Sequence, residues 1–304
     1  MLKILFNTAT LATTLRLSAP LAFATMGAAY GYMAQIFNIG LESYMLTSAF
    51  FATWGSYMFE NPLVGLIFGM LTGIIMSAIF GTFVLHFKSD PIVVGIAMNL
   101  SSWGFTSLML LTVFKVRGSI MDPRIVSFKT VDIPLIDKIP LINEVFNNQN
   151  TLVYFALLAV ILSQIVIYKT PFGLRLRGVG INAKAAQTTG TNIIKYKWIS
   201  LIITGALVGI SGAFLPLSGI SMFTENMSAG KGFLAVSAIR IGKGNPVKGF
   251  LACLIFAYAD AVAVGLQSYS ISSQIVLMTP YIATVVVMCL TNLDQLKHRA
   301  SESI

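Results

Sequence analysis

Long apolar runs separated by short polar stretches dominate the 304-residue chain. Six of these runs contain no Asp, Glu, Lys or Arg, and they cover residues 17–41, 61–85, 91–114, 151–168, 198–222 and 268–292. Because about 20 apolar residues in a helix cross the hydrocarbon core of a bilayer, such runs predict transmembrane helices. The pattern therefore predicts an all-α polytopic membrane protein.

Breaks at charged residues, Pro and Gly set the expected number of helices. The candidate spans are 12–35, 41–59, 62–86, 92–114, 151–168, 198–218, 229–241, 248–267 and 271–291. Segment 229–241 is too short to cross about 30 Å of hydrocarbon as a helix, so a broken or re-entrant segment is expected there. We expect about nine transmembrane helices, with eight or ten if the first or the seventh span is assigned wrongly.

The charges in the connecting loops predict the orientation. Loop 169–197 has six basic and no acidic residues, and segment 231–248 has four basic and no acidic ones. Loop 115–150 instead balances five basic residues against four acidic ones. Since Lys and Arg concentrate in cytoplasmic loops, the first two segments are expected inside and loop 115–150 outside. The C-terminus is then cytoplasmic and the N-terminus external.

Two short motifs recur along the chain and predict an internal repeat. Residues 61–65 (Asn-Pro-Leu-Val-Gly) match 245–249 (Asn-Pro-Val-Lys-Gly), and 89–93 (Ser-Asp-Pro-Ile-Val) match 272–276 (Ser-Ser-Gln-Ile-Val) at nearly the same offset. Four spans, one linking span and four more spans make the second unit enter the membrane from the opposite side. Inverted repeats of this kind are typical of transporters, and a membrane anchor or assembly protein is the alternative.

The expected organisation is one transmembrane domain over residues 1–304. Its expected parts are repeat one at about 12–114, external loop 115–150, linking helix 151–168, cytoplasmic loop 169–197 and repeat two at about 198–291.

Polar side chains within or beside the spans are the candidates for lining a translocation path, because such groups usually face a cavity or the bundle interior. The candidates are Asn38, Glu42, Asn99, Glu225, Asn226 and Asp260. For Asp260, in the middle of a span, a path-lining role and a structural hydrogen-bonding role both remain open. Glu42 follows a break between helices, so it could instead cap a helix N-terminus.

Small residues at four-residue spacing predict close helix packing rather than a pore-lining face. One stripe comprises Gly65, Gly69, Gly73, Ser77 and Gly81, and a shorter one comprises Gly205, Gly209 and Ala213.

No catalytic constellation or metal-ligand spacing is found in the sequence, so an enzyme is not expected. Residues 229–232 (Ala-Gly-Lys-Gly) imitate a phosphate-binding loop but lack its first Gly and the Ser or Thr after Lys. ATP is therefore not expected to bind this chain by that motif. The net charge of +9 fits the basic loops, so no nucleic-acid partner is expected.

Four segments carry a family resemblance. They are 38–42 (Asn-Ile-Gly-Leu-Glu), 90–99 (Asp-Pro-Ile-Val-Val-Gly-Ile-Ala-Met-Asn), 170–180 (Thr-Pro-Phe-Gly-Leu-Arg-Leu-Arg-Gly-Val-Gly) and 223–233 (Phe-Thr-Glu-Asn-Met-Ser-Ala-Gly-Lys-Gly-Phe). As a set they resemble the permease subunits of bacterial ABC importers in the ribose, branched-chain amino acid and nucleoside group. Segments 38–42 and 224–227 are most similar to the purine nucleoside branch, although Ser43 stands where that branch commonly has Gly.

The resemblance implies a multi-pass subunit of the bacterial cytoplasmic (inner) membrane that forms the pathway for a small polar solute, with a nucleoside as the first expectation. It also implies ABC ATPase subunits that carry ATP and Mg²⁺, a second permease of identical or different sequence, and an external binding lipoprotein or soluble binding protein. No cofactor is expected on this chain itself. A sugar or branched-chain amino acid permease and an ion-coupled secondary transporter are the alternatives.

Loop 169–197 also contains a candidate contact with the ATPase. Residues 182–188 are good helix-forming sequence bounded by two glycines, and the resemblance places a coupling helix here. The expected coupling residues are Gly180, Asn182, Lys184, Ala185, Ala186 and Gly190. A solvated basic loop near anionic headgroups is the alternative.

Overall fold

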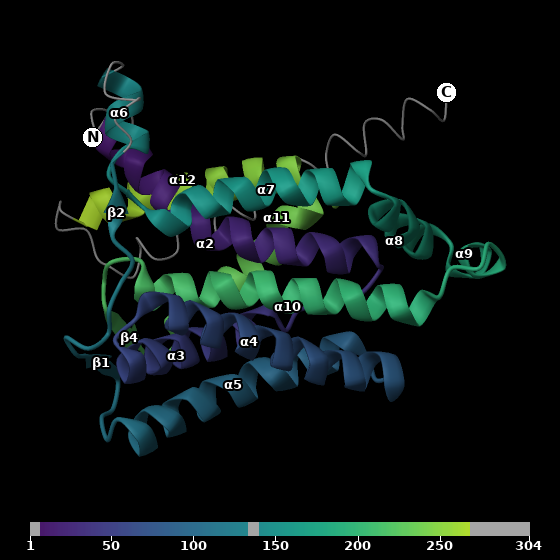
Figure 1. The fold of residues 1–304 in the computed structure, drawn as a ribbon, viewed down its shortest axis with the longest axis horizontal. Coiled ribbons are helices and arrows are strands. Elements are labelled where there is room, and N and C mark those ends of the chain that lie inside the picture. Colours follow the sequence, from purple (N-terminus) through teal and green to yellow (C-terminus); the bar gives the residue numbers. More distant parts are fainter. Residues whose placement is uncertain (1–6, 133–139, 268–304) are drawn as a thin grey trace.

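The computed structural model describes residues 7–132 and 140–267, and helices make up most of them. The long helices are α2 (Thr8–Met33), α3 (Leu41–Phe59), α4 (Pro62–Gly81), α5 (Pro91–Val113), α7 (Thr151–Lys169), α10 (Ile193–Leu217) and α12 (Pro246–Gln267). The shorter ones are the π-helix η1 (Thr82–His86), α6 (Pro140–Phe146), α8 (Pro171–Ile181), α9 (Ala183–Thr188) and α11 (Lys231–Ile241). The long helices run side by side along the longest axis of the molecule (Figure 1).

Within residues 7–132 and 140–267, five helical stretches are long and apolar enough to cross a bilayer. They are Pro62–His86, Pro91–Val113, Thr151–Lys169, Ile193–Leu217 and Pro246–Gly265. With only 11 residues, α11 is too short to cross alone, as the length of segment 229–241 predicts. The ninth expected span, 271–291, lies outside the described residues. The total of nine therefore stays a prediction.

Two further long helices, α2 and α3, carry many hydroxyl side chains and are mostly buried. Several of these hydroxyls bond within their own helix: Thr14 donates to the carbonyl of Thr10 at 2.7 Å, and Thr53 donates to that of Ala49 at 2.8 Å. The burial of α2 follows from its neighbours, since α7, α10, α11 and α12 all pack against it. These two helices form the centre of the bundle.

The recurring Asn-Pro and Asp-Pro motifs mark the first residues of helices. Asn61 caps α4 by accepting from the amide of Leu63 at 2.9 Å, and Asp90 caps α5 by accepting from two amides. Asn245, the repeat partner of Asn61, accepts from the amide of Lys248 at 3.1 Å at the start of α12. An N-cap oxygen followed by Pro suits a helix start, which explains why these motifs recur.

The small-residue stripe of α4 packs against α10, as its spacing predicts. A Cβ atom built on Gly73 would lie 2.6 Å from the Cα of Gly209, and one built on Gly69 would lie 2.7 Å from the Cβ of Ala213. Ser77 donates from its hydroxyl to the carbonyl of Leu201 across the same contact. The two stripes therefore let the backbones of α4 and α10 approach closely.

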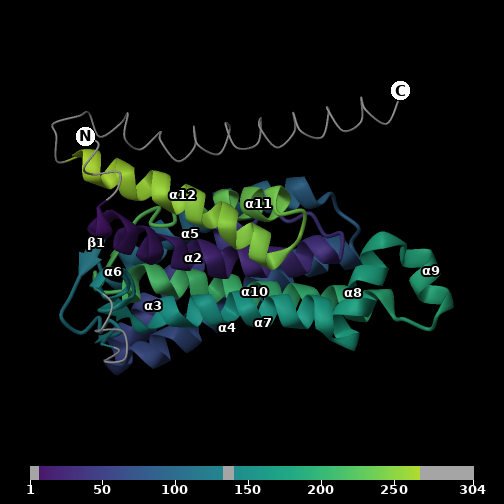
Figure 2. The same ribbon diagram turned by 90° about the horizontal axis from the view of Figure 1, so that it is seen from above.

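The packing of the remaining helices has the reciprocity that an inverted repeat requires. If α2 corresponds to α10 and α4 to α12, the contact of α10 with α4 must match one of α2 with α12, and both exist. Figure 2 shows α11 and α12 next to each other beside α2. The last span of the second unit falls outside the described residues, so the complete repeat stays a prediction.

The loops lie at two opposite ends of the bundle. One end holds residue 7 and the segment from α5 to α7, and the other holds α8 and α9 (Figure 1). The first end contains two antiparallel strand pairs that the sequence did not predict: β1 (Ser119–Met121) with β4 (Met222–Thr224), and β2 (Thr130–Val131) with β3 (Gln149–Asn150). Loops 115–150 and 169–197 are thus separated along the bundle, as their charges predict.

Candidate functional site

A cavity of about 570 Å³ lies between α3, α5, α11 and α12, and we call it the polar cavity. It brings together four of the six path candidates, namely Glu42, Asn99, Asn226 and Asp260. The remaining lining residues are Leu46, Ile96, Leu100, Trp103, Ala229, Gly230, Lys231, Phe233 and Leu234. Side chains from both halves of the chain therefore converge on one space.

Glu42 lines this cavity, and both of its carboxylate oxygens accept hydrogen bonds. One carboxylate oxygen accepts from the hydroxyl of Ser228 at 2.5 Å and from the amide of Gly230 at 2.8 Å, while the other accepts from the amide of Gly232 at 2.7 Å. Glu42 thus caps the N-terminus of α11, although it belongs to α3, and its charge complements the positive end of the α11 dipole. Glu42 fixes α11 against α3.

Asn99 links α5 to the start of α3. Its amide nitrogen donates to the carbonyl of Ile39 at 3.2 Å, and its oxygen accepts from the amide of Ser43 at 3.0 Å. The backbones meet closely here, since a Cβ on Gly95 would lie 2.9 Å from the amide nitrogen of Gly40. Asn99 therefore shapes the cavity by holding two of its walls together.

The polar groups that face the open space are those of Asn226, Lys231 and Asp260. Asp260 is half-buried on α12, and Lys231, at the first position of α11, lines the same cavity. Trp103 of α5 and Phe233 of α11 add aromatic surface, with 53% and 44% of their area exposed. The cavity thus combines aromatic walls with one acid, one base and one amide.

The other two path candidates lie elsewhere. Asn38 accepts from the amide of Gly40 at 2.8 Å, donates to the hydroxyl of Tyr44 at 3.0 Å, and lines a second cavity. Glu225 accepts from the amide of Gly118 at 3.1 Å and so extends the β1–β4 pair at the end that holds loop 115–150. The structure does not bring these two residues into the polar cavity.

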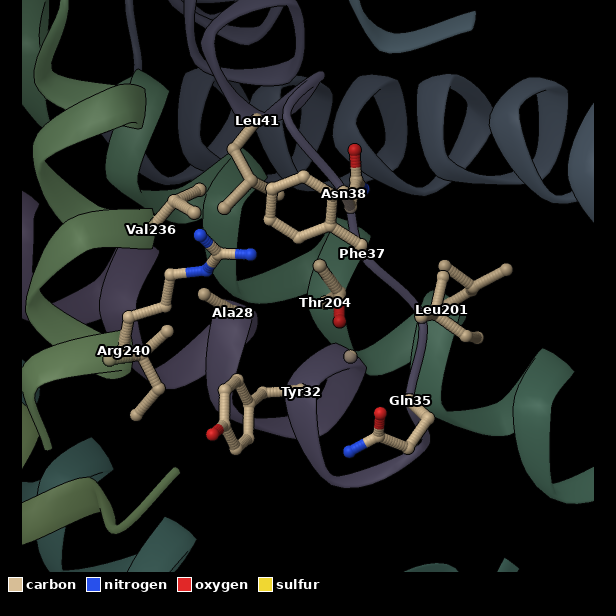
Figure 3. A pocket seen from close by; sticks show the side chains of 13 residues that line it. Ala28, Tyr32, Gln35, Phe37, Asn38, Leu41, Leu201, Thr204, Val236 and Arg240 are labelled. Atoms are coloured by element: carbon tan, nitrogen blue, oxygen red, sulfur yellow. The ribbon is translucent and has the colours of Figure 1, made fainter. Parts of the chain in front are cut away.

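The second cavity has a volume of about 420 Å³ and lies between the last turns of α2, residues 35–41, α10 and α11. We call it the Arg240 cavity. Figure 3 shows the guanidinium of Arg240 directed toward the ring of Phe37, and its central carbon lies 4.2 Å from the ring centroid. Sequence reasoning missed Arg240 because it was counted only as a basic residue of segment 231–248.

The predicted coupling segment forms a helix with the expected end. Asn182 caps α9 by accepting from the amide of Ala185 at 3.0 Å. Gly190, with φ of +80°, ends it, and its amide donates to the carbonyl of Gln187 at 3.0 Å. Lys184 and Ala185 are exposed, and Ala186, one residue further along α9, is half-buried.

The prediction that Gly180 marks the start of this helix is wrong. Residues 171–181, expected as loop, form the additional helix α8, and Gly180 lies inside its last turn. A Cβ on Gly180 would lie 2.1 Å from the carbonyl oxygen of Met33, at the end of α2. Gly180 is therefore required for the contact between α8 and α2, and the change of direction before α9 occurs at Asn182.

Comparisons with known proteins agree with this architecture. The chain is 33% identical to the nucleoside ABC transporter permease protein NupC of Lactococcus lactis, with 90% of this chain and 89% of that protein covered. It is 29% identical to the guanosine ABC transporter permease protein NupQ of Bacillus subtilis, with 90% and 89% covered.

A solved ABC transporter described as of the metal-chelate type, in an inward-facing conformation, has a similar fold. Its TM-score is 0.53 at 17% identity, with 92% of this chain and 84% of that chain covered. The family model described as "Branched-chain amino acid transport system / permease component" matches residues 10–290. This multi-pass membrane protein therefore belongs to that family of ABC transporter permeases.

Proposed function

We propose that this permease carries a nucleoside inward across the bacterial cytoplasmic membrane and that the polar cavity is part of its path. The observation that carries the proposal is the convergence of Glu42, Asn99, Asn226 and Asp260, from both halves of the chain, on one cavity. Permeases named for nucleoside and guanosine transport that are similar over nine-tenths of the chain support this choice of solute.

The lining of the polar cavity suits a nucleoside. Trp103 and Phe233 provide surfaces on which a base can stack, and Asn226, Lys231 and Asp260 provide hydrogen-bonding groups for base edges and ribose hydroxyls. A volume of about 570 Å³ lies within the range of small-molecule sites, roughly 300–1,000 Å³. Glu42 and Asn99 serve as positioning residues, because their hydrogen bonds hold α3, α5 and α11 around the space.

The orientation and the partners complete the proposal. The end with loop 115–150 faces outside and receives the solute from a binding lipoprotein, while α8 and α9 face the cytoplasm. ABC ATPases dock on the exposed side of α9, where Lys184 and Ala185 lie. ATP and Mg²⁺ are bound by those ATPases, and a second permease, identical or different, completes the transporter.

The test of the path uses the complete transporter in proteoliposomes and a labelled nucleoside. Asp260→Leu is expected to abolish uptake while the protein still accumulates in the membrane, since removal of a carboxylate from a span favours insertion by about 2.5 kcal/mol or more. Gln164→Leu is the matched control, because it also replaces an intramembrane polar group with Leu but lies on α7, away from the cavity. Normal uptake by Asp260→Leu would leave Asp260 with a structural role only.

The same vesicles distinguish the alternative functions. Uptake that requires ATP and persists when ionophores collapse the ion gradients supports the ABC importer. Uptake that continues without ATP but stops with the gradients would favour an ion-coupled carrier. Competition by unlabelled sugars or branched-chain amino acids, without competition by nucleosides, would reassign the solute.

A further inference from the structure

The Arg240 cavity presents an arginine that forms no ion pair with any carboxylate among the described residues. The ring of Phe37 covers one face of the guanidinium at 4.2 Å, which leaves the N–H groups along its planar edge available. No acidic residue lines this cavity. Within the part of the chain that the structure describes, the one ion pair is that of Arg124 with Asp122, in the segment between β1 and β2.

Two further polar side chains, those of Tyr32 and Gln35, line this cavity without a hydrogen-bond partner among the described residues. Figure 3 shows Tyr32 and Gln35 on the side of the opening away from Phe37. Neither the hydroxyl of Tyr32 nor the side-chain amide of Gln35 takes part in the hydrogen bonds found among residues 7–132 and 140–267. By contrast, the hydroxyl of Thr204 donates to the carbonyl of Gly27 at 2.8 Å. The free groups are thus one cation, one phenol and one amide around an aromatic ring.

The surroundings of the cavity are strongly basic. It lies at the α8 end of the bundle, since Gly180 of α8 meets the carbonyl of Met33 and the side chain of Gln35. Segments 169–197 and 240–248 at this end carry nine basic residues and no acidic ones. A field of one sign concentrates anions near a cavity, so a negatively charged compound is favoured here over a neutral nucleoside.

We propose that the Arg240 cavity binds a phosphomonoester of nucleotide size from the cytoplasm and that its occupation slows import. A planar guanidinium binds two phosphate oxygens at once, and a volume of about 420 Å³ accommodates a nucleoside monophosphate. The inference rests on the proposed solute and orientation, because phosphoryl transfer to an imported nucleoside yields such a compound on that side.

The position of the cavity explains how its occupant affects transport. Val236, Ile239 and Arg240 line it from the C-terminal half of α11, while Lys231 and Phe233 in the first turn of the same helix line the polar cavity. A ligand wedged between α11 and residues 35–41 holds α11 in one position. A path that needs movement of α11 is then arrested.

Binding is measured by equilibrium dialysis of labelled GMP with the purified complete transporter. Arg240→Gln is expected to weaken GMP binding to the permease about tenfold or more, and Arg240→Lys to restore it only in part, because Lys lacks the planar fork. Phe37→Leu, which removes the ring beneath the guanidinium, is the second variant and should also weaken binding. Lys243→Gln is the matched control, since it removes the same charge in the next turn without lining the cavity.

Because the ATPases are identical in all these complexes, a difference between the parent and Arg240→Gln assigns the binding to the permease. Equal GMP binding by the two would overturn the proposal. This measurement needs no transport, so it decides about the cavity even if the complete transporter proves not to carry nucleosides.

Uptake tests the inhibitory role. GMP trapped inside proteoliposomes is expected to slow nucleoside entry in the parent and in Lys243→Gln, and to leave Arg240→Gln unaffected. Reduced uptake by Arg240→Gln without any GMP would overturn the proposal and make the cavity the inner part of the solute path. Vesicles with and without phosphatidylglycerol separate the two sources of phosphate: an Arg240-dependent response to this lipid alone, whose phosphate is a diester, would overturn the nucleotide proposal and name a lipid headgroup as the occupant.

Discussion

Replacement of Gly73 by Ala tests how closely α4 and α10 are held together. A Cβ atom at this position would lie 2.2 Å from the carbonyl oxygen of Gly205 and 2.6 Å from the Cα of Gly209. Both neighbours are backbone atoms, so no side chain can rotate away. The two helices would have to separate by roughly 1 Å before the contact becomes an ordinary one.

This separation should destabilise the protein by about 1–3 kcal/mol, the usual cost of extra volume in a packed interior. A gap of this size also removes roughly a quarter to a half of the dispersion energy along the stripe. The lipid does not compensate, because it provides no hydrophobic driving force between helices. Gly104→Ala is the matched control, since no heavy atom lies within 4 Å of its Cβ. The Gly104→Ala replacement should leave the free energy of unfolding unchanged or raise it by up to about 1 kcal/mol, because Ala has a higher helix propensity than Gly.

Thermal unfolding in detergent measures the difference. In a Cys289→Ser background, the fully buried Cys253 reacts with a thiol-specific dye only when its surroundings open. Gly73→Ala should unfold several degrees below the parent, and Gly104→Ala should not. Gly205→Ala, whose Cβ would lie 2.5 Å from the carbonyl of Gly73, opens the same gap, so the two replacements combined should cost less than their sum.

An unchanged unfolding temperature for Gly73→Ala would refute close packing at this contact. Strictly additive effects of the two replacements would show that they act at separate places.

Three other predictions concern topology, coupling and the cap of α11. A single Cys at Asn7 should react with an impermeant thiol reagent in intact cells and one at Asn182 only after the membrane is opened; labelling of Asn182 in intact cells contradicts the topology. Ala185→Trp, which changes bulk but not charge, should insert normally yet fail to drive uptake, and substrate-stimulated ATP hydrolysis like that of the parent would remove α9 from the mechanism. Glu42→Gln should lower uptake and the unfolding temperature together, because a neutral amide caps α11 less well; parent-like values for both would exclude this role.

The sequence predicts the helices well where local rules decide. Apolar length and the breaks at charged residues, Pro and Gly locate the starts of α4 and α5 to within one residue. The small-residue spacing of α4 predicts a face for close helix packing, because four-residue spacing places residues on one helix face, but only the structure shows that the partner is α10. Helix starts and the composition of one helix face are both determined by residues within a few positions of each other in the sequence.

The site is predicted only in part, because its geometry depends on contacts between distant segments. Scarcity of polar groups in the spans finds Asn99 and Asp260, yet it cannot show that Asn99 is occupied by the backbone of residues 39–43. The cap that Glu42 gives to α11 joins residues 190 positions apart, as in its bond to Gly232. The need for glycine at position 180 also depends on a distant segment, because a side chain there would collide with the end of α2.

These long-range contacts form one continuous route from α9 to the polar cavity. α9 follows α8 directly, and α8 meets the end of α2 where Gly180 contacts Met33. Residues 34–40 connect α2 to Glu42, which caps α11 by three hydrogen bonds. Rigid contacts of this kind transmit displacement rather than absorb it, because packed backbones and charge-assisted bonds have few alternative arrangements. If the ATPases dock on α9 as proposed, a movement imposed there would reach the wall of the polar cavity through α8, α2 and the carboxylate of Glu42.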